Sequence, residues 1–171
     1  MALKVNQHVL ATSFPVNSSA TILKGQVVVL NTSGEVVLGD DDLYSWALGF
    51  AGDEKSTLSA GSFANRAWEL GDDTNASSRI TVYRGVGTEL YIDTTDVFTS
   101  TAATVGALCY VSDTAGKIQT GAPGSNDVQA CRVIDLLTAN SGYLDSGIPN
   151  VNVPVDDVNS PRTFYLISTL I

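Results

Sequence analysis

Histidine, cysteine and positive charge are scarce in this 171-residue sequence, and each scarcity excludes a kind of chemistry. The single histidine is His8, so metal sites built on imidazole and Ser-His-Asp or Cys-His catalysis are excluded unless His8 folds back onto the domain. The two cysteines, Cys109 and Cys131, match no zinc-ligand spacing. We expect both to be reduced thiols in the core, with a disulfide between them as the alternative. From this supply of residues we predict that the chain is not an enzyme.

Long apolar runs and net positive charge are also missing. No run approaches the ~20 apolar residues that a membrane-spanning helix needs. The first residues lack the apolar stretch before a small-residue cleavage site that marks a signal peptide, so none is expected. Nine Lys and Arg residues against 18 Asp and Glu residues give a net charge of −9. Such a charge repels phosphate backbones and anionic membrane surfaces, so we expect no nucleic acid and no membrane among the partners.

Short strands and tight turns dominate what is present. Ser and Thr number 17 each, beside 15 glycines, and this mixture favours pleated surfaces and turns over helices. The length fits one domain. We predict an N-terminal arm over residues 1–18, partly extended and stopped by Pro15, and a single β-rich domain over residues 19–171. The predicted fold is all-β, a small β-barrel or β-sandwich of the β-tulip kind, which ends in a C-terminal strand over residues 163–171.

Two strand-turn-strand units are the clearest elements. The first places strands at 26–30 and 35–38 around a turn in which Gly34 supplies a positive φ. The second unit, 105–121, echoes the first. In this alignment Gly25 matches Gly106, Gly34 matches Gly116 after one inserted residue, and the following segments 50–53 and 132–135 correspond. The echo indicates a weak internal repeat of 20–55 in 101–137, which a duplication would explain without being proved by it.

The remaining segments are assigned from their residue patterns. Residues 46–52 favour a buried strand, in which Gly49 and Gly52 would let another backbone approach closely. The segment 60–70 fits a strand better than a helix. The other expected elements are strands at 80–84 and 88–92 joined by the loop Gly85–Gly87, surface loops at 71–78 and 122–127, and an irregular segment at 93–104.

Several motifs could carry chemistry, and each has a plainer explanation. The GxG of Arg84–Gly87 lacks the third small residue of a dinucleotide fingerprint and joins two strands, so a hairpin loop explains it better. The aspartate clusters could supply oxygen ligands for calcium, but they lack the spacing of a calcium loop, and solvated turn carboxylates are favoured. Nothing places Trp46 or Trp68 beside an acid, as a glycosidase cleft would require. We therefore predict no catalytic, cofactor-binding or metal-binding residue and no cofactor. The clusters are Asp40–Asp42, Asp72–Asp73 and Asp156–Asp157.

The second hairpin carries a resemblance to a known group of proteins. Its sequence, Gly106-Ala-Leu-Cys-Tyr-Val-Ser-Asp-Thr-Ala-Gly116-Lys-Ile118, resembles small structural proteins of tailed-bacteriophage heads. The segments KGQVVVLNTSGEV (24–36) and WALGFA (46–51) resemble the same group. The resemblance implies a head-decoration (cement) protein that is β-rich, often trimeric and seated on the outer face of the capsid. It assigns no functional residue, because such proteins act through their surfaces.

The expected function is therefore non-enzymatic decoration of a phage head. The chain would be assembled in the host cytoplasm, bind the major capsid protein on the outer surface of the virion as a homotrimer, and stabilise the shell. Many modest contacts gain strength through multivalency, and an acidic exterior keeps the copies soluble. We expect the contacts in the N-terminal arm and the C-terminal strand. The alternatives are another virion part (a tail, fibre or spike module), a carbohydrate-binding adhesive β-sandwich with Trp46, Trp68 and Tyr91 exposed, and a hydrolase that uses the aspartate clusters.

Overall fold

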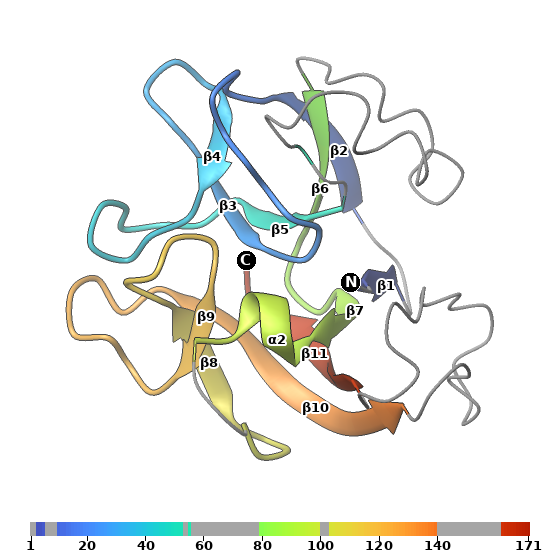
Figure 1. Ribbon diagram of the computed structural model, residues 1–171. Coiled ribbons are helices and arrows are strands. Elements are labelled where there is room, and N and C mark those ends of the chain that lie inside the picture. The colour runs from blue at the N-terminus through green and yellow to red at the C-terminus, as the bar shows by residue number, and fades with distance from the viewer. Residues whose placement is uncertain (1–2, 6–9, 53–54, 56–78, 100–102, 140–161) are drawn as a thin grey trace.

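The fold consists of two antiparallel β-sheets, one above the other in Figure 1. The computed structural model describes residues 3–5, 10–52, 55, 79–99, 103–139 and 162–171. Helix in this part of the chain is limited to the four residues of α2, Thr94–Val97. The predicted all-β class is thus confirmed. A search of the same residues for a helix with the length and hydropathy to cross a membrane finds no candidate.

The five-stranded sheet has the order β2-β6-β5-β3-β4, and the six-stranded sheet has the order β1-β7-β11-β10-β8-β9. The strands of the first sheet are β2 (Leu10–Pro15), β3 (Val27–Leu30), β4 (Val36–Leu38), β5 (Gly49–Ala51) and β6 (Arg79–Arg84). The strands of the second sheet are β1 (Leu3–Val5), β7 (Glu89–Asp93), β8 (Leu108–Val111), β9 (Ile118–Thr120), β10 (Gln129–Ala139) and β11 (Arg162–Thr169).

The two sheets share one topology. In chain order, β2 to β6 pair in the same pattern as β7 to β11: the first strand pairs with the fifth, the fifth with the fourth, the fourth with the second, and the second with the third. The register also agrees, because Val27 lies opposite Phe50 in one sheet and Leu108 lies opposite Arg132 in the other. Among the described strands, only β1 has no counterpart. The weak sequence echo is therefore part of a longer structural repeat, residues 10–84 and 89–169.

Matching hydrogen bonds support this equivalence. The amide of Gly25 donates to the carbonyl of Ala51 at 2.7 Å, and the amide of Gly106 donates to the carbonyl of Val133 at 2.8 Å. The two glycines have φ values of 89° and 88°, a conformation that L side chains rarely adopt. Each glycine thus turns the chain into the second strand of its repeat in the same way.

One bridge in each repeat curls the sheet. Immediately after β2, Val16 makes a parallel bridge to Val36. The equivalent bridge in the second repeat joins Phe98 to Ile118. The four residues of α2 are inserted immediately before the second bridge. A single bridge brings the two edges of a sheet together without a continuous ladder, so each sheet is strongly curved but not closed into a barrel.

Each curled sheet surrounds its own hydrophobic core. All seven members of the first core have an equivalent in the second under the register above. The second core is larger, because Val27 and Phe50 from the other face of the first sheet also pack into it. The burial of these two side chains joins the repeats. The first core is Val16, Ile22, Val28, Val36, Ala51, Ile80 and Val82, and the equivalent residues are Phe98, Ala103, Cys109, Ile118, Val133, Tyr165 and Ile167.

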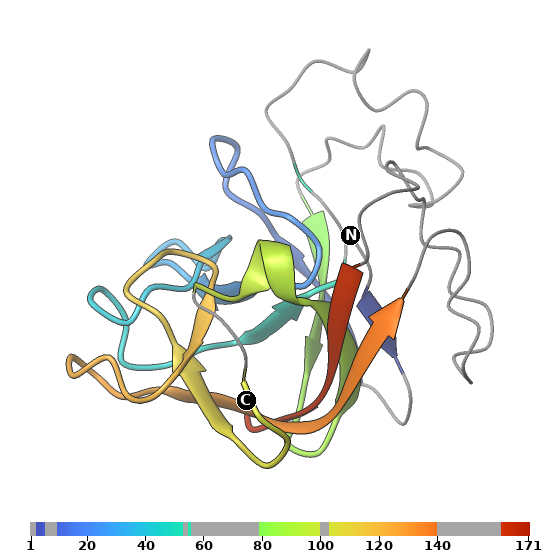
Figure 2. The same cartoon turned by 60° about the horizontal axis from the view of Figure 1, so that its bottom comes forward.

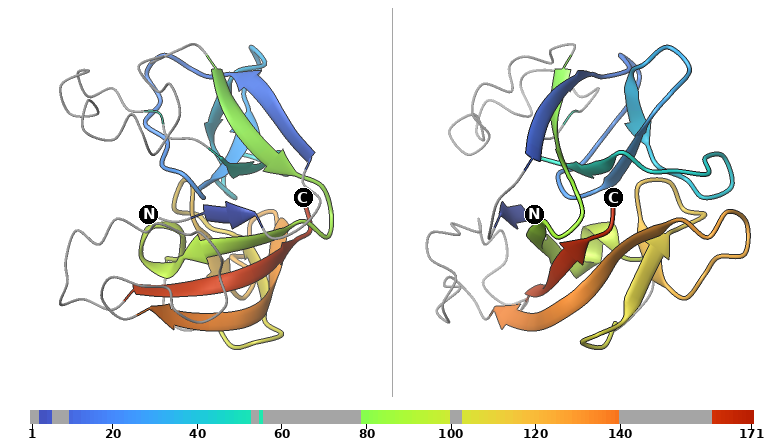
Figure 3. Two further views of the ribbon diagram at one scale, coloured as in Figure 1. Left: turned by 90° about the vertical axis from the view of Figure 1, so that its right-hand side faces the viewer. Right: turned by 180° about the vertical axis from the view of Figure 1, so that it is seen from behind.

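Both ends of the chain are more integrated than the sequence predicts. Within the predicted arm, Leu10–Pro15 form β2 and pair with β6 along their whole length. Val16 is only 4% exposed and belongs to the first core. Pro15 does not stop the strand, because a proline is tolerated where an edge strand faces solvent. The predicted C-terminal strand is β11, which lies between β7 and β10 (Figure 3). Both of its edges are paired, so it has none left to offer a neighbour.

The structure differs from the prediction in two inner segments, 46–52 and 93–104. The strand predicted over 46–52 is limited to β5, and Trp46 before it is exposed. The close approach at Gly49 is confirmed, because a Cβ atom there would collide with the backbone oxygen of Tyr83. The segment predicted as irregular over 93–104 begins with the last residue of β7, Asp93, and continues with α2. The predicted strand at 60–70 and loop at 71–78 lie outside the described residues.

Candidate interaction surfaces

The predicted motifs fall in different parts of the structure. His8, Trp68 and the two later aspartate clusters lie outside the described residues. Gly85–Gly87 joins β6 to β7 with positive φ at both glycines, but these strands belong to different sheets, so the loop connects the two repeats and the predicted hairpin between them is wrong. Where the structure describes the chain, no three His, Cys, Asp or Glu side chains come together in a way that could hold a metal ion. The first aspartate cluster, Asp40–Asp42, follows β4.

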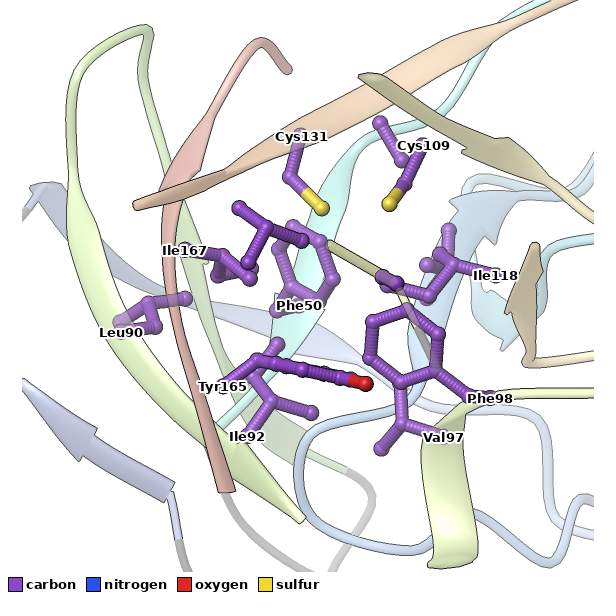
Figure 4. Close-up of a cluster of buried hydrophobic side chains, with 14 of the residues drawn as sticks. Phe50, Leu90, Ile92, Val97, Phe98, Cys109, Ile118, Cys131, Tyr165 and Ile167 are labelled. Atoms are coloured by element: carbon purple, nitrogen blue, oxygen red, sulfur yellow. The ribbon is translucent and has the colours of Figure 1, made fainter. Parts of the chain in front are cut away.

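Cys109 and Cys131 face each other across the β8–β10 pair as free, fully buried thiols. Figure 4 shows both sulfur atoms in the second core, near Phe50 and Ile118. Burial raises the pKa of Cys131 well above its usual value, and the neighbouring thiol adds to this effect. A neutral buried thiol behaves as a small apolar side chain rather than as a nucleophile. The pair therefore acts as packing in the core, as expected for reduced thiols.

Asp41 joins the two repeats through a buried carboxylate. It is 0% exposed and lies in the loop 39–48, beside the loop 121–128 of the other repeat. Its Oδ2 accepts the amide of Asn126 at 2.7 Å, and its Oδ1 accepts the amide of Val128 at 3.2 Å. Its own amide donates to the carbonyl of Ser112 at 3.1 Å, and its carbonyl accepts the side-chain amide of Asn126. A buried carboxylate that accepts two backbone amides holds the loop that carries them firmly, because hydrogen bonds to a charged acceptor are stronger than those between neutral groups.

A second contact between the repeats surrounds Gly116. Its carbonyl accepts the amide of Val27 at 3.0 Å, and its amide donates to the carbonyl of Gly39 at 2.6 Å. Glycine is required here, since φ is +77° and a Cβ atom would come within 2.8 Å of Leu38. The turn of the second hairpin is thus packed against the first repeat.

Glu35 fastens the end of β2 to the first hairpin. Its Oε2 accepts the side-chain amides of Asn17 at 2.8 Å and Asn31 at 3.2 Å. These two hydrogen bonds, that from Asn17 first, hold the pKa of Glu35 below its usual value. The amide of Asn17 in turn donates to the carbonyl of Val36 at 3.1 Å. The bridge that curls the first sheet is therefore reinforced by side chains.

The loops held by Asp41 present an exposed apolar surface. Leu43 is 73% exposed and Trp46 is 42% exposed, both in the loop 39–48. This loop and the loop 121–128 project on the same side of the molecule (Figure 2). Because the loop is held in place, little conformational entropy remains to be lost on binding. Exposed tryptophan on a fixed loop is typical of a protein-binding or sugar-binding surface.

Negative charge surrounds this surface. Asp113, at the turn of the second hairpin, has a pKa raised above its usual value by partial loss of hydration and then by the charges of Asp42, Asp41 and Asp40. The carboxylate of Asp42 is held by the hydroxyl of Ser125, at 2.6 Å. The predicted role of this cluster as solvated turn carboxylates applies to Asp42 but not to Asp41. Three consecutive aspartates contain no signal that distinguishes the buried one.

Comparison with protein-family models and with curated protein sequences finds no match for this chain. Within the described residues, the arrangement offers several surfaces: two fixed loops, one of which exposes Leu43 and Trp46, neighbouring carboxylates, and the edges of two sheets. These are the parts of the structure that a partner can bind. Tyr91, a third aromatic residue named for sugar binding, is half-buried on β7.

Proposed function

We propose that this chain is a non-enzymatic decoration protein of a tailed-bacteriophage head, which binds the outer surface of the shell as an oligomer, a trimer in the simplest case. One observation carries the proposal. The hairpin that resembles head proteins occurs in both repeats at equivalent positions, β3–β4 and β8–β9, each followed by a strand that pairs with it. The resemblance therefore covers the strands that build the centre of each repeat.

The charge and the loops are consistent with this function. A net charge of −9 suits the outside of a particle whose DNA is enclosed, because it repels nucleic acid. The exposed side chains of Leu43 and Trp46 offer a fixed apolar contact for the shell. Each contact needs only modest affinity, since many copies bind one particle. The partner on this proposal is the major capsid protein.

The test is reconstitution on shells of the phage that encodes the chain, prepared without it. Labelled chain is added, particles are sedimented, and bound copies are counted and located by electron cryo-microscopy. We expect regular occupancy of the outer shell, reduced by Trp46→Ala and unchanged by the control Val86→Ala, which alters an exposed side chain on the β6–β7 loop. Deletion of residues 1–9 tests the remaining arm without removing β2. Absence from the shell, or a location on the tail, would overturn the proposal.

A second candidate function, carbohydrate binding, is favoured by the exposure of Trp46. A sugar ring that stacks on an exposed indole changes its fluorescence. Titration with a panel of mono- and oligosaccharides, using Trp46→Phe as the control, decides between the two functions. Saturable quenching that is lost in this variant would support sugar binding, and an unchanged spectrum would exclude it for the sugars tested.

A further inference from the structure

The four edges of the two sheets are protected unequally. The edge of β4 is bridged by Val16, and the edge of β9 is bridged by Phe98. The edge strand β1 is short, with only three residues. The edge strand β2 is different: it is six residues long, carries no charge and, among the described residues, has no bridge on its outer edge along Leu10–Pro15. Native proteins seldom leave an edge of this kind without a partner.

The backbone of β2 offers hydrogen-bonding groups along its free edge. The amide of Gly52 on the β5 side donates to the carbonyl of Thr81 at 2.8 Å, so Thr81 of β6 points away from β2. Ser13 lies opposite Thr81 and therefore points to the free edge, as does Ala11, because the direction alternates along an antiparallel pair. Beyond the β6 ladder, the described hydrogen bonds to β2 are two from Arg79 to Ser13, one on its carbonyl and one on its hydroxyl. Within the part of the chain that the structure describes, the amides of Ala11 and Ser13 thus have no hydrogen-bond partner.

The repeat shows what fits such an edge. In the second repeat β7 occupies the position of β2, and its corresponding edge is covered by β1 in antiparallel pairing, with Lys4 opposite Tyr91. Under the register of the repeats, Tyr91 is the counterpart of Ser13. The outer edges of β2 and β7 are therefore equivalent, and in the described structure β1 covers the edge of β7 but not that of β2.

One strand β1 can serve both the edge of β7 and the edge of β2, because a strand has two edges of its own. Lys4 points toward β7, so the backbone groups of Leu3 and Val5 point to the opposite edge of β1. An antiparallel register with Leu3 opposite Ser13 and Val5 opposite Ala11 gives the amides of Ser13 and Ala11 acceptors on β1, and it leaves out Pro15, which has no amide to donate. One β1 could then pair with its own β7 and with β2 of another molecule.

We infer that the free edge of β2 binds the N-terminal strand β1 of a second copy of this chain. The contact is head to tail, since β1 of one copy meets β2 of the next, and such contacts close into rings when the rotation permits. The inference deepens the proposed function, on which it rests for the expectation of an oligomer. It assigns the seam between copies to main-chain pairing rather than to the loops around Asp41.

The first test uses the chain itself as the probe. Val5→Cys and Ala11→Cys variants are prepared separately, one with a mass tag, then mixed and treated with a short bis-maleimide cross-linker. We expect a mixed covalent dimer whose linked peptides contain residues 5 and 11. Ser33→Cys, an exposed position on the first hairpin, replaces Ala11→Cys in the control and should give none. The native cysteines are buried and should not react.

The second test compares Ser13→Pro with Ser13→Ala by sedimentation velocity over a range of concentrations. Both variants lose the hydroxyl bond to Arg79, but only Ser13→Pro loses an amide on the free edge, so it alone should weaken association, by about tenfold. Equal thermal midpoints confirm that both fold. A monomeric wild-type chain, or an oligomer that neither cross-links nor responds to Ser13→Pro, overturns the inference. In the latter case the shell-binding experiment can still succeed, so the two failures are distinguishable.

Discussion

Replacement of Asp41 tests the account of how the two repeats are held together. In Asp41→Ala the part-buried amides of Asn126 and Val128 lose their acceptor. Each lost hydrogen bond costs about 0.5–1.5 kcal/mol where the freed donor can reach solvent. Two such bonds predict a loss of about 1–3 kcal/mol in the free energy of unfolding, with no cation left unpaired, since no ion pair involves Asp41 among the described residues. Asp41→Asn retains one acceptor oxygen and should lose about half as much.

The matched control is Asp42→Asn, which removes the same charge from the neighbouring, exposed residue. Its only described side-chain partners are the hydroxyl of Ser125 and solvent, so the change should stay within about 0.5 kcal/mol. Equilibrium urea unfolding gives the free energies, and amide hydrogen exchange at residues 126 and 128 locates the effect. We expect both amides to exchange faster in Asp41→Ala than in the control.

Equal stability of Asp41→Ala and Asp42→Asn would refute the reasoning. It would mean that the loop 121–128 finds other acceptors when the carboxylate is removed. Loss of stability without faster exchange at residues 126 and 128 would also contradict it, because the predicted loss originates at those two donors.

The remaining predictions concern the core and a surface carboxyl. Cys109 and Cys131 should resist a thiol reagent in the native state and release two thiols per chain on denaturation; one or none released would show a disulfide. Phe50→Ala should lower the free energy of unfolding by about 3–5 kcal/mol, whereas Leu43→Ala, at an exposed site, should change it by less than about 0.5 kcal/mol. The pKa of Glu35 is lowered by folding, so its stabilising effect is present above the unfolded-state pKa and is lost as pH falls. The stability difference between wild type and Glu35→Gln should therefore shrink in acid, and a difference independent of pH would contradict it.

Local signals determined the two hairpins, because each depends on residues close together in the chain. The turn glycines Gly34 and Gly116 both have positive φ, and the apolar residues before them form the predicted strands. The loop Gly85–Gly87 has the positive φ values that its glycines suggest, but it joins strands of different sheets rather than a hairpin, because strand pairing is not a local property. The echo between the hairpins was visible in sequence for the same reason, since both copies must satisfy the same turn geometry.

Only the tertiary structure decided how far the repeat extends and where each polar residue lies. The pairing of β2 with β6 joins residues about 70 positions apart in the chain, and no local pattern specifies such a partner. The burial of Asp41 depends on donors in a loop of the other repeat, and the exposure of Trp46 depends on where β5 begins. Sequence patterns report the chain's own geometry, whereas burial and partners are set by segments that meet only after folding.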